Sequence, residues 1–146
     1  MSIEFIHDND SIMAIILPHD YQDDGIKFIT PENFSQQLAY IHHPAGKIIQ
    51  PHVHKPLKRE VSYTQEVLVI KRGKLRVDFY NPDQVYLVSR ILSAGDTILL
   101  ASAGHGFEIL EEIEMIEIKQ GPYGGGDADK VRFEPISSDK LDVHYH

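Results

Sequence analysis

Turn-forming residues interrupt the middle of this chain at short intervals. Glycine, proline, serine, asparagine and aspartate gather at five places, which are 71–73, 81–83, 93–96, 102–104 and 121–122. Turns about 8–12 residues apart are typical of short antiparallel strands in a sandwich or a small barrel. This spacing constrains the fold more than any other feature of the sequence, and it favours an all-β domain.

The segments between the turns alternate between apolar and polar side chains. Leu75, Val77 and Phe79 alternate with Arg76, Asp78 and Tyr80. A period of two places one set on the buried face of a strand, and the other set is then expected to be exposed. The pattern predicts one helical turn after residue 30 and strands at about 11–17, 25–29, 37–43, 47–54, 66–72, 74–80, 85–92, 96–100, 106–110 and 114–120.

Length and composition indicate the class of protein. A chain of 146 residues is expected to form one domain that buries about two-thirds of its unfolded surface. It contains no cysteine, which excludes disulfides and thiolate metal sites. The longest apolar run, 12–17, is too short for the roughly 20 residues of a membrane-spanning helix. The N-terminus has acidic residues where a secretory signal is basic, so we expect a cytoplasmic protein that binds no membrane.

The charge of the chain is unevenly distributed. Its net charge of −8 argues against nucleic acid as a partner. The window 47–76 holds eight basic and two acidic residues, a balance of +6, which leaves −14 for the rest of the chain. A local basic region attracts a small anion without attracting a polyanion, so the expected partner is a small molecule.

His52 and His54 are the first candidate metal ligands. If residues 47–54 form a strand, both imidazoles lie on one face of it, about 6–7 Å apart, and can reach one metal ion. The chain has nine histidines, so a pair with this spacing is expected by chance about half the time. The pair by itself leaves metal binding open.

Two motifs place this pair in a wider pattern. Gly46 precedes His52 by five intervening residues, and Glu66 precedes Gly73 by six. Together these residues resemble the first sequence motif of the cupin superfamily. Twenty-two residues after Gly73, the run from 95 to 107 begins with Gly-Asp and contains His105. It looks like the second cupin motif, so the resemblance covers residues 46–107.

The chain departs from the cupin pattern in both motifs. Eleven residues separate His54 from Glu66, far more than in the family pattern, and we expect this insertion, 55–65, to form a long loop at the mouth of the barrel. In the second motif, alanines replace the usual proline and the usual middle glycine. His105 also arrives one residue early, which makes it the least typical of the four residues that match cupin ligands.

The resemblance implies an all-β double-stranded β-helix, or jelly-roll barrel, with a metal ion inside. The barrel core would span 36–120, with N-terminal strands in 1–35 packed on it and a Gly-rich loop and tail in 121–146, all in one domain. The metal ligands that the resemblance implies are His52, His54, Glu66 and His105. Such a set suits one divalent metal ion, and without thiolates it does not choose between Fe, Mn, Ni and Zn.

Further residues are candidates for contact with a substrate. Lys55, Lys58 and Arg59 lie in the inserted loop and would suit a phosphorylated or carboxylated ligand. Three candidates lie elsewhere in the chain, and they are His42, Arg76 and Tyr123. For the first two, the alternative is an exposed position on the wet face of a strand, and for Tyr123 it is a plain exit turn.

Two classes of function fit these motifs. The first is a metal-dependent isomerase, epimerase or dioxygenase that acts on a small polar or anionic substrate such as a sugar derivative. The stretches 105–107 and 119–123 are similar to those of small cupins associated with carbohydrate metabolism. The second is a non-catalytic module that binds or senses a sugar or a metal. The family resemblance and the apolar strands 11–17 and 25–29 also predict a symmetric homodimer.

Overall fold

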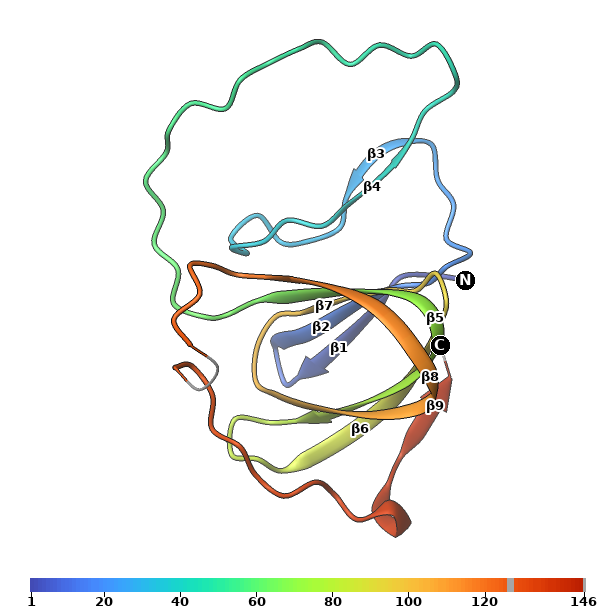
Figure 1. The fold of residues 1–146 in the computed structure, drawn as a ribbon, viewed down its shortest axis with the longest axis vertical. Coiled ribbons are helices and arrows are strands. Elements are labelled where there is room, and N and C mark those ends of the chain that lie inside the picture. Colours follow the sequence, from blue (N-terminus) through green and yellow to red (C-terminus); the bar gives the residue numbers. More distant parts are fainter. Residues whose placement is uncertain (126–127, 146) are drawn as a thin grey trace.

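The computed structural model describes residues 1–125 and 128–145, and nearly all of its regular structure is β-strand (Figure 1). A single 3-10 turn, Ser138–Lys140, lies near its C-terminal end. The strands are β1 (Glu4–Asp8), β2 (Ser11–Leu17), β3 (Gly25–Phe28), β4 (Ala39–His42), β5 (Glu66–Tyr80), β6 (Tyr86–Ser93), β7 (Thr97–Leu100), β8 (Gly104–Lys119) and β9 (Val143–Tyr145). In the described part, no helix has the length and apolar character that crossing a membrane requires.

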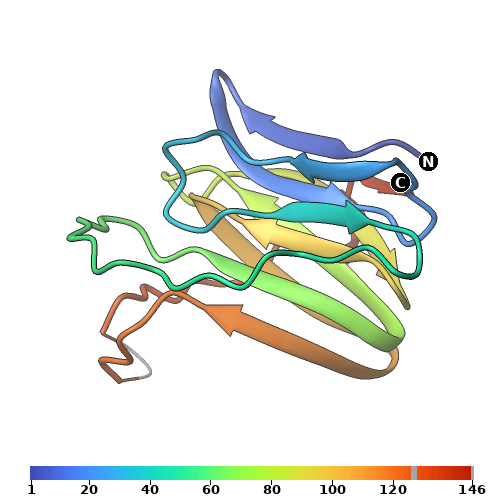
Figure 2. The same ribbon diagram turned by 90° about the horizontal axis from the view of Figure 1, so that it is seen from above.

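Seven of the strands form one curled sheet. Its order is β1-β2-β7-β5-β6-β9, and β8 pairs with β5 along the whole length of that strand. All these pairs are antiparallel except β6 with β9, which is parallel. The remaining strands, β3 and β4, pair only with each other. Seen from above, β8 is the outermost strand on one side of the molecule (Figure 2).

The apolar core lies inside the curl of the sheet. Its side chains come from β1, β2, β5, β6 and β7, and Ile16, Leu68, Phe79, Leu92 and Ile98 are among them. Burial of each such side chain stabilises the fold by about 1.5–3 kcal/mol, so the sheet gains by curling around them. The all-β class predicted from the turn spacing is confirmed.

β5 and β8 are each longer than the sequence pattern predicts. The predicted strands 66–72 and 74–80 form one continuous strand, and those at 106–110 and 114–120 form another. Gly73 explains the apparent break, because its φ is +94° and a Cβ there would overlap the backbone carbonyl of Glu112. The register of the β5–β8 pair shifts three times between Ile70 and Leu75, so the set of alternate residues that faces the core changes there.

The predicted strand 47–54 does not form. All residues from 44 to 63 are exposed and unpaired in the sheet, and this segment sweeps away from it (Figure 1). Pro51 and Pro56 contribute to this outcome, because neither can donate a backbone hydrogen bond to a strand partner. Residues 44–63 are called the outer segment below.

Two strands form that the sequence pattern does not predict. β1 is short and largely polar, and β9 has only three residues, so neither gives a clear alternation. β9 lies in the predicted tail 121–146, of which residues 126, 127 and 146 are outside the described part. β1 also covers one side of β2, so the apolar strand predicted at 11–17 has β1 and β7 as neighbours and offers no open edge to a second copy.

Candidate functional site

A cavity of about 820 Å³ lies where β5, β8 and the C-terminal part of the chain meet. β5 contributes four of its residues to the wall, and residues 102–108 form a second part of it. Residues 62–64 and a group between 129 and 138 complete the lining. The volume lies in the range of small-molecule sites, which is about 300–1,000 Å³.

Glu66 begins β5 and places a carboxyl group in this cavity. It lies on the same face of β5 as Leu68 and Ile70 of the core, and only 9% of its surface is exposed. The pKa of Glu66 is raised to about 7, mainly by burial and also by the hydrogen bond with Glu117 and its negative charge. The carboxyl group of Glu66 is therefore present in both its protonated and its ionised form near neutral pH.

His105 follows Gly104 at the start of β8 and lies beside Glu66. Its Nε2 atom is 3.8 Å from Oε1 of Glu66, beyond the distance of a hydrogen bond. Burial lowers the pKa of the His105 imidazole. The imidazole is therefore neutral at pH 7, so the two side chains do not form an ion pair at that pH. A neutral imidazole donates a hydrogen bond from one ring nitrogen and accepts one at the other.

Glu117 of β8 determines where the proton of the carboxyl pair resides. The hydrogen bond from Glu66 lowers the pKa of Glu117, while the pKa of Glu66 is raised. Two neighbouring carboxyl groups titrate as a pair, and the more buried one keeps the proton to higher pH. When the pair binds one proton, Glu66 therefore holds that proton and Glu117 stays ionised.

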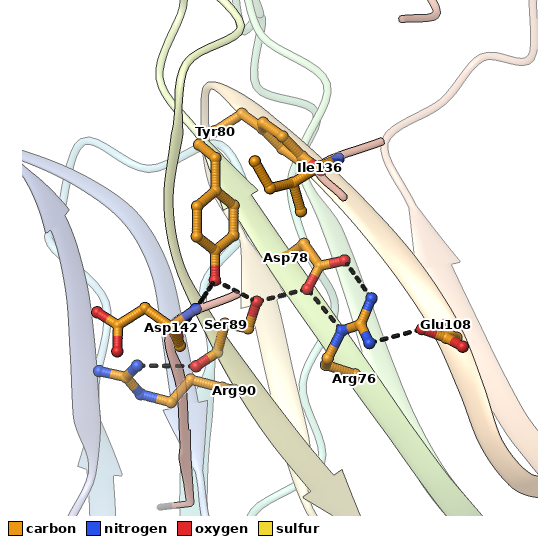
Figure 3. Close-up of polar contacts among 9 residues, drawn as sticks. Arg76, Asp78, Tyr80, Ser89, Arg90, Glu108, Ile136 and Asp142 are labelled. Atoms are coloured by element: carbon orange, nitrogen blue, oxygen red, sulfur yellow. Dashed lines mark hydrogen bonds and ion pairs between the residues drawn. The ribbon is translucent and has the colours of Figure 1, made fainter. Parts of the chain in front are cut away.

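Arg76 and Asp78 form a second polar group in the cavity wall. The guanidinium donates two hydrogen bonds to the Asp78 carboxylate, at 2.8 and 3.0 Å, and also contacts Glu108 of β8 (Figure 3). Ser89 of β6 donates a further hydrogen bond to Asp78. Asp78 is only 3% exposed, and the surrounding acids raise the pKa of the Arg76 guanidinium. This group is rigid and its charges are paired.

Glycines and the C-terminal part of the chain shape the remaining wall. Gly104 and Gly106 lie opposite Tyr80 and Asp78 in the β5–β8 register, so no side chain from β8 fills the space above them. Tyr80 then contacts the C-terminal part: its ring meets Phe133 edge-on at 4.9 Å, and its hydroxyl accepts a hydrogen bond from the backbone N–H of Ile136. The parallel pairing of β9 with β6 holds this part of the chain in place.

Half of the predicted site residues lie on the outer segment. The imidazole rings of His52 and His54 are 5.2 Å apart, and Nδ1 of His52 donates a hydrogen bond to the carbonyl oxygen of Gln50. Lys55, Lys58 and Arg59 follow them on the same exposed stretch. None of the five is among the residues that line the cavity.

The structure brings Glu66 and His105 together but does not place the two other predicted metal ligands beside them. Within residues 1–125 and 128–145, no three histidine, aspartate or glutamate side chains are close enough together to hold a metal ion. As they are placed, the residues do not fit the metal that the resemblance implies. The four-ligand metal site stays a prediction from the sequence.

Of the three predicted substrate residues outside the inserted loop, Arg76 lines the cavity, whereas His42 and Tyr123 lie outside it. His42 is at the end of β4, where Nδ1 lies 3.1 Å from the carbonyl oxygen of Asp23 and 3.2 Å from the carboxylate of Asp24. Tyr123 lines a smaller cavity of about 220 Å³, which shares residues 62–64 with the larger one. The Gly-rich loop predicted at 121–126 ends outside the described residues.

Sequence reasoning missed several residues of the cavity. Asp78 and Tyr80 were expected to be exposed with Arg76, but the C-terminal part of the chain covers this face and buries both. Glu108 lies at the start of a run of glutamates that is typical of a solvated strand. The signal that could have found the site is the pair of glycines at 104 and 106, since glycine weakens a strand unless it makes room for something.

Comparisons with models of known protein families, with curated proteins and with solved structures found no match. The similarity of two motifs to the cupin superfamily stays a prediction from the sequence. The residues of the cavity are therefore the basis for assigning a function.

Proposed function

We propose that this protein is an isomerase or epimerase that moves a proton on a small polar substrate in the cavity between β5 and β8. The observation that carries the proposal is the carboxyl group of Glu66, which is buried in the cavity with a pKa of about 7 and lies 3.8 Å from the neutral imidazole of His105. An acid-base catalyst works best when its pKa is close to the working pH. Perturbed titratable groups in a cavity are also typical of active sites.

The two groups suit proton transfer next to a carbonyl group. Ionised Glu66 removes the proton from the carbon beside the carbonyl, and the electron pair of the C–H bond forms the double bond of an enolate. His105 donates a hydrogen bond to the carbonyl oxygen, on which the negative charge develops. Delivery of a proton from water to the opposite face of that carbon, with loss of the Glu66 proton to water, gives an epimer. If that carbon carries a hydroxyl group, transfer of the Glu66 proton to the former carbonyl carbon, with the hydroxyl proton passing to the former carbonyl oxygen, gives an isomer. No oxidant or reductant is consumed.

The lining of the cavity favours a substrate with several hydroxyl groups and a negative charge. Tyr80, Thr64, Asp78 and Glu108 offer hydrogen-bonding groups, which suit the hydroxyls of a sugar derivative. Lys130 and Arg132 add cationic side chains, which suit a phosphate or a carboxylate. We therefore propose a sugar derivative with a carbonyl group and an anionic substituent as the substrate class.

Deuterium exchange tests this proposal. Wild-type protein is incubated in D2O with carbonyl sugars, free, phosphorylated or nucleotide-linked, that raise its melting temperature. We expect deuterium to be incorporated at the carbon beside the carbonyl. Mass spectrometry and NMR measure this incorporation. The Glu66→Gln variant should exchange about 10²–10⁴-fold more slowly, because it lacks the base but keeps the shape of the side chain.

Two results would contradict the proposal. If no ligand that stabilises the wild type exchanges, the protein is a binding module of the kind that the sequence also allowed. If Glu66→Gln exchanges as fast as the wild type, Glu66 is not the base. The matched control is Glu60→Gln on the outer segment, which removes an exposed carboxylate and should leave exchange unchanged.

We also propose that the curled sheet is part of a cupin-like jelly-roll barrel. It is supported by Glu66 and His105, which come from the two cupin-like motifs and line the same cavity. The curl of the sheet is compatible with such a barrel. Solution NMR contacts between β8 and the strands that face it across the curl would test the closure of the barrel.

A further inference from the structure

One of the longest strands of the sheet has an open edge. β8 pairs with β5 along one side, and among the described residues no strand pairs with its other side (Figure 2). Such an edge presents backbone N–H and C=O groups that can pair with another chain. Apolar side chains of β8 are exposed as well, and they are Phe107, Ile109, Leu110, Ile116 and Ile118. This edge therefore has the properties of a contact surface.

The outer segment also lacks a partner. Within it, residues 47–59 carry four large apolar side chains that are mostly exposed, which are Ile48, Ile49, Val53 and Leu57. Loops of this length without secondary structure are uncommon in compact domains and usually serve a function. A segment that only connects two strands does not need four exposed apolar side chains.

The two surfaces have opposite charge. Residues 47–59 contain four basic residues and no acidic one, whereas β8 contains five glutamates and one lysine. Since the net charge of the chain is −8, the part outside 47–59 carries −12. Glu111, Glu112 and Glu114 of β8 pair with basic residues of β5 but stay largely exposed, so they can also contact an arriving cation.

We propose that residues 47–59 of one copy of this chain lie along the open edge of β8 in a second copy. The segment lies along the edge in extended form, with apolar contacts on either side and with backbone hydrogen bonds only between the prolines, since Pro51 and Pro56 cannot donate one. A two-fold axis repeats the contact, so each chain both gives and receives a segment. This dimer does not depend on the reaction that the cavity performs.

The segment of a second copy is better placed to cover the open edge of β8 than the segment of the same chain. The outer segment leaves β4 at His42, which is held by Asp23 and Asp24. It returns at Gln65, whose side-chain oxygen accepts hydrogen bonds from the hydroxyl of Ser35 and from the backbone N–H of Gln36. Between these two anchors the segment points away from the sheet (Figure 1). A second copy can receive it without breaking either anchor.

Cross-linking tests the contact directly, since the chain has no cysteine that would give background. A Val53→Cys variant is mixed with a size-tagged Ile109→Cys variant and treated with a short bismaleimide. We expect a covalent dimer with one chain of each kind. The control mixture pairs Val53→Cys with Asp83→Cys, in the turn between β5 and β6, and should give at least about tenfold less product.

Equal yields from the two mixtures would overturn the proposal. The double variant Val53→Cys/Ile109→Cys provides a second check, because it should join two chains. If it cross-links only within one chain, the segment closes on its own β8 and the exchange between copies does not occur.

Light scattering tests the dimer without cross-linking. Wild-type protein at micromolar concentration should have twice the mass of one chain. Ile109→Lys should raise the dimer dissociation constant about tenfold or more, because it removes an apolar contact and places a positive charge against the basic segment. Val85→Lys is the matched control. Ile109 is 50% exposed and Val85, just before β6, is 55% exposed, so neither variant should unfold, which circular dichroism checks.

A monomeric wild type would contradict the proposal. So would a wild-type dimer that Ile109→Lys weakens no more than Val85→Lys does.

Discussion

At pH 8, the Glu66→Gln variant is expected to be more stable than the wild type by about 2–3 kcal/mol, whereas at pH 4.5 the two should be equally stable. The pKa of Glu66 rises from its ordinary value of 4.5 to about 7 in the folded protein. Between these values the folded state binds more protons than the unfolded state, so the wild type loses stability as the pH rises. Above pH 7 the loss is complete.

The glutamine variant should not show this loss, because its amide stays neutral and still donates a hydrogen bond to Glu117. Urea unfolding at several pH values from 4.5 to 8.5 measures the difference between the two proteins. Glu60→Gln on the exposed outer segment is the control, and its curve should follow that of the wild type. Parallel curves for wild type and Glu66→Gln would show that Glu66 is not buried as described.

Arg76→Met is expected to lower the free energy of unfolding by about 3–5 kcal/mol, as for the loss of one partner of a buried ion pair. The substitution leaves the carboxylate of Asp78, which is 3% exposed, without its two hydrogen bonds from the guanidinium. Ser89 alone does not compensate for a buried negative charge. Denaturant unfolding at pH 7 measures this effect.

The double variant Arg76→Met/Asp78→Leu separates the lost attraction from the unpaired charge. It should lose less than half as much stability as Arg76→Met, because no buried charge is left without a partner. Arg72→Met is the matched control: Arg72 contacts Glu112 and Glu114 in solvent, and its loss should change stability by about 0–1 kcal/mol. A double variant that is less stable than Arg76→Met would refute this account of the pair.

Alternation along the chain predicted the strands of the sheet well but did not predict their ends. The position of Glu66 two residues before Leu68 indicated that it points inward, and it does. The same rule does not carry across Gly73, where the register shifts exchange the faces of the strand. Such shifts arise from the pairing of β5 with β8, and a pattern within one strand contains no information about its partner.

The cavity was harder to predict than the fold. Asp78 and Tyr80 look like an exposed face of β5 because their cover, around Phe133 and Ile136, comes from a segment more than 50 residues away. The predicted strand at 47–54 shows the opposite error. Its apolar residues, Ile48, Ile49 and Val53, resemble those of a strand, but a strand forms only where a neighbouring edge accepts its hydrogen bonds.

The floor and the cover of the cavity are held with unequal strength. β8 pairs with β5 along the whole length of that strand, whereas β9, which holds the cover, pairs with β6 at three residues and has no buried side chain. Segments with few hydrogen bonds and little burial open more readily than the strands of a core. The cover can therefore separate while the sheet stays formed, which exposes Tyr80 and Asp78 and opens a route into the cavity.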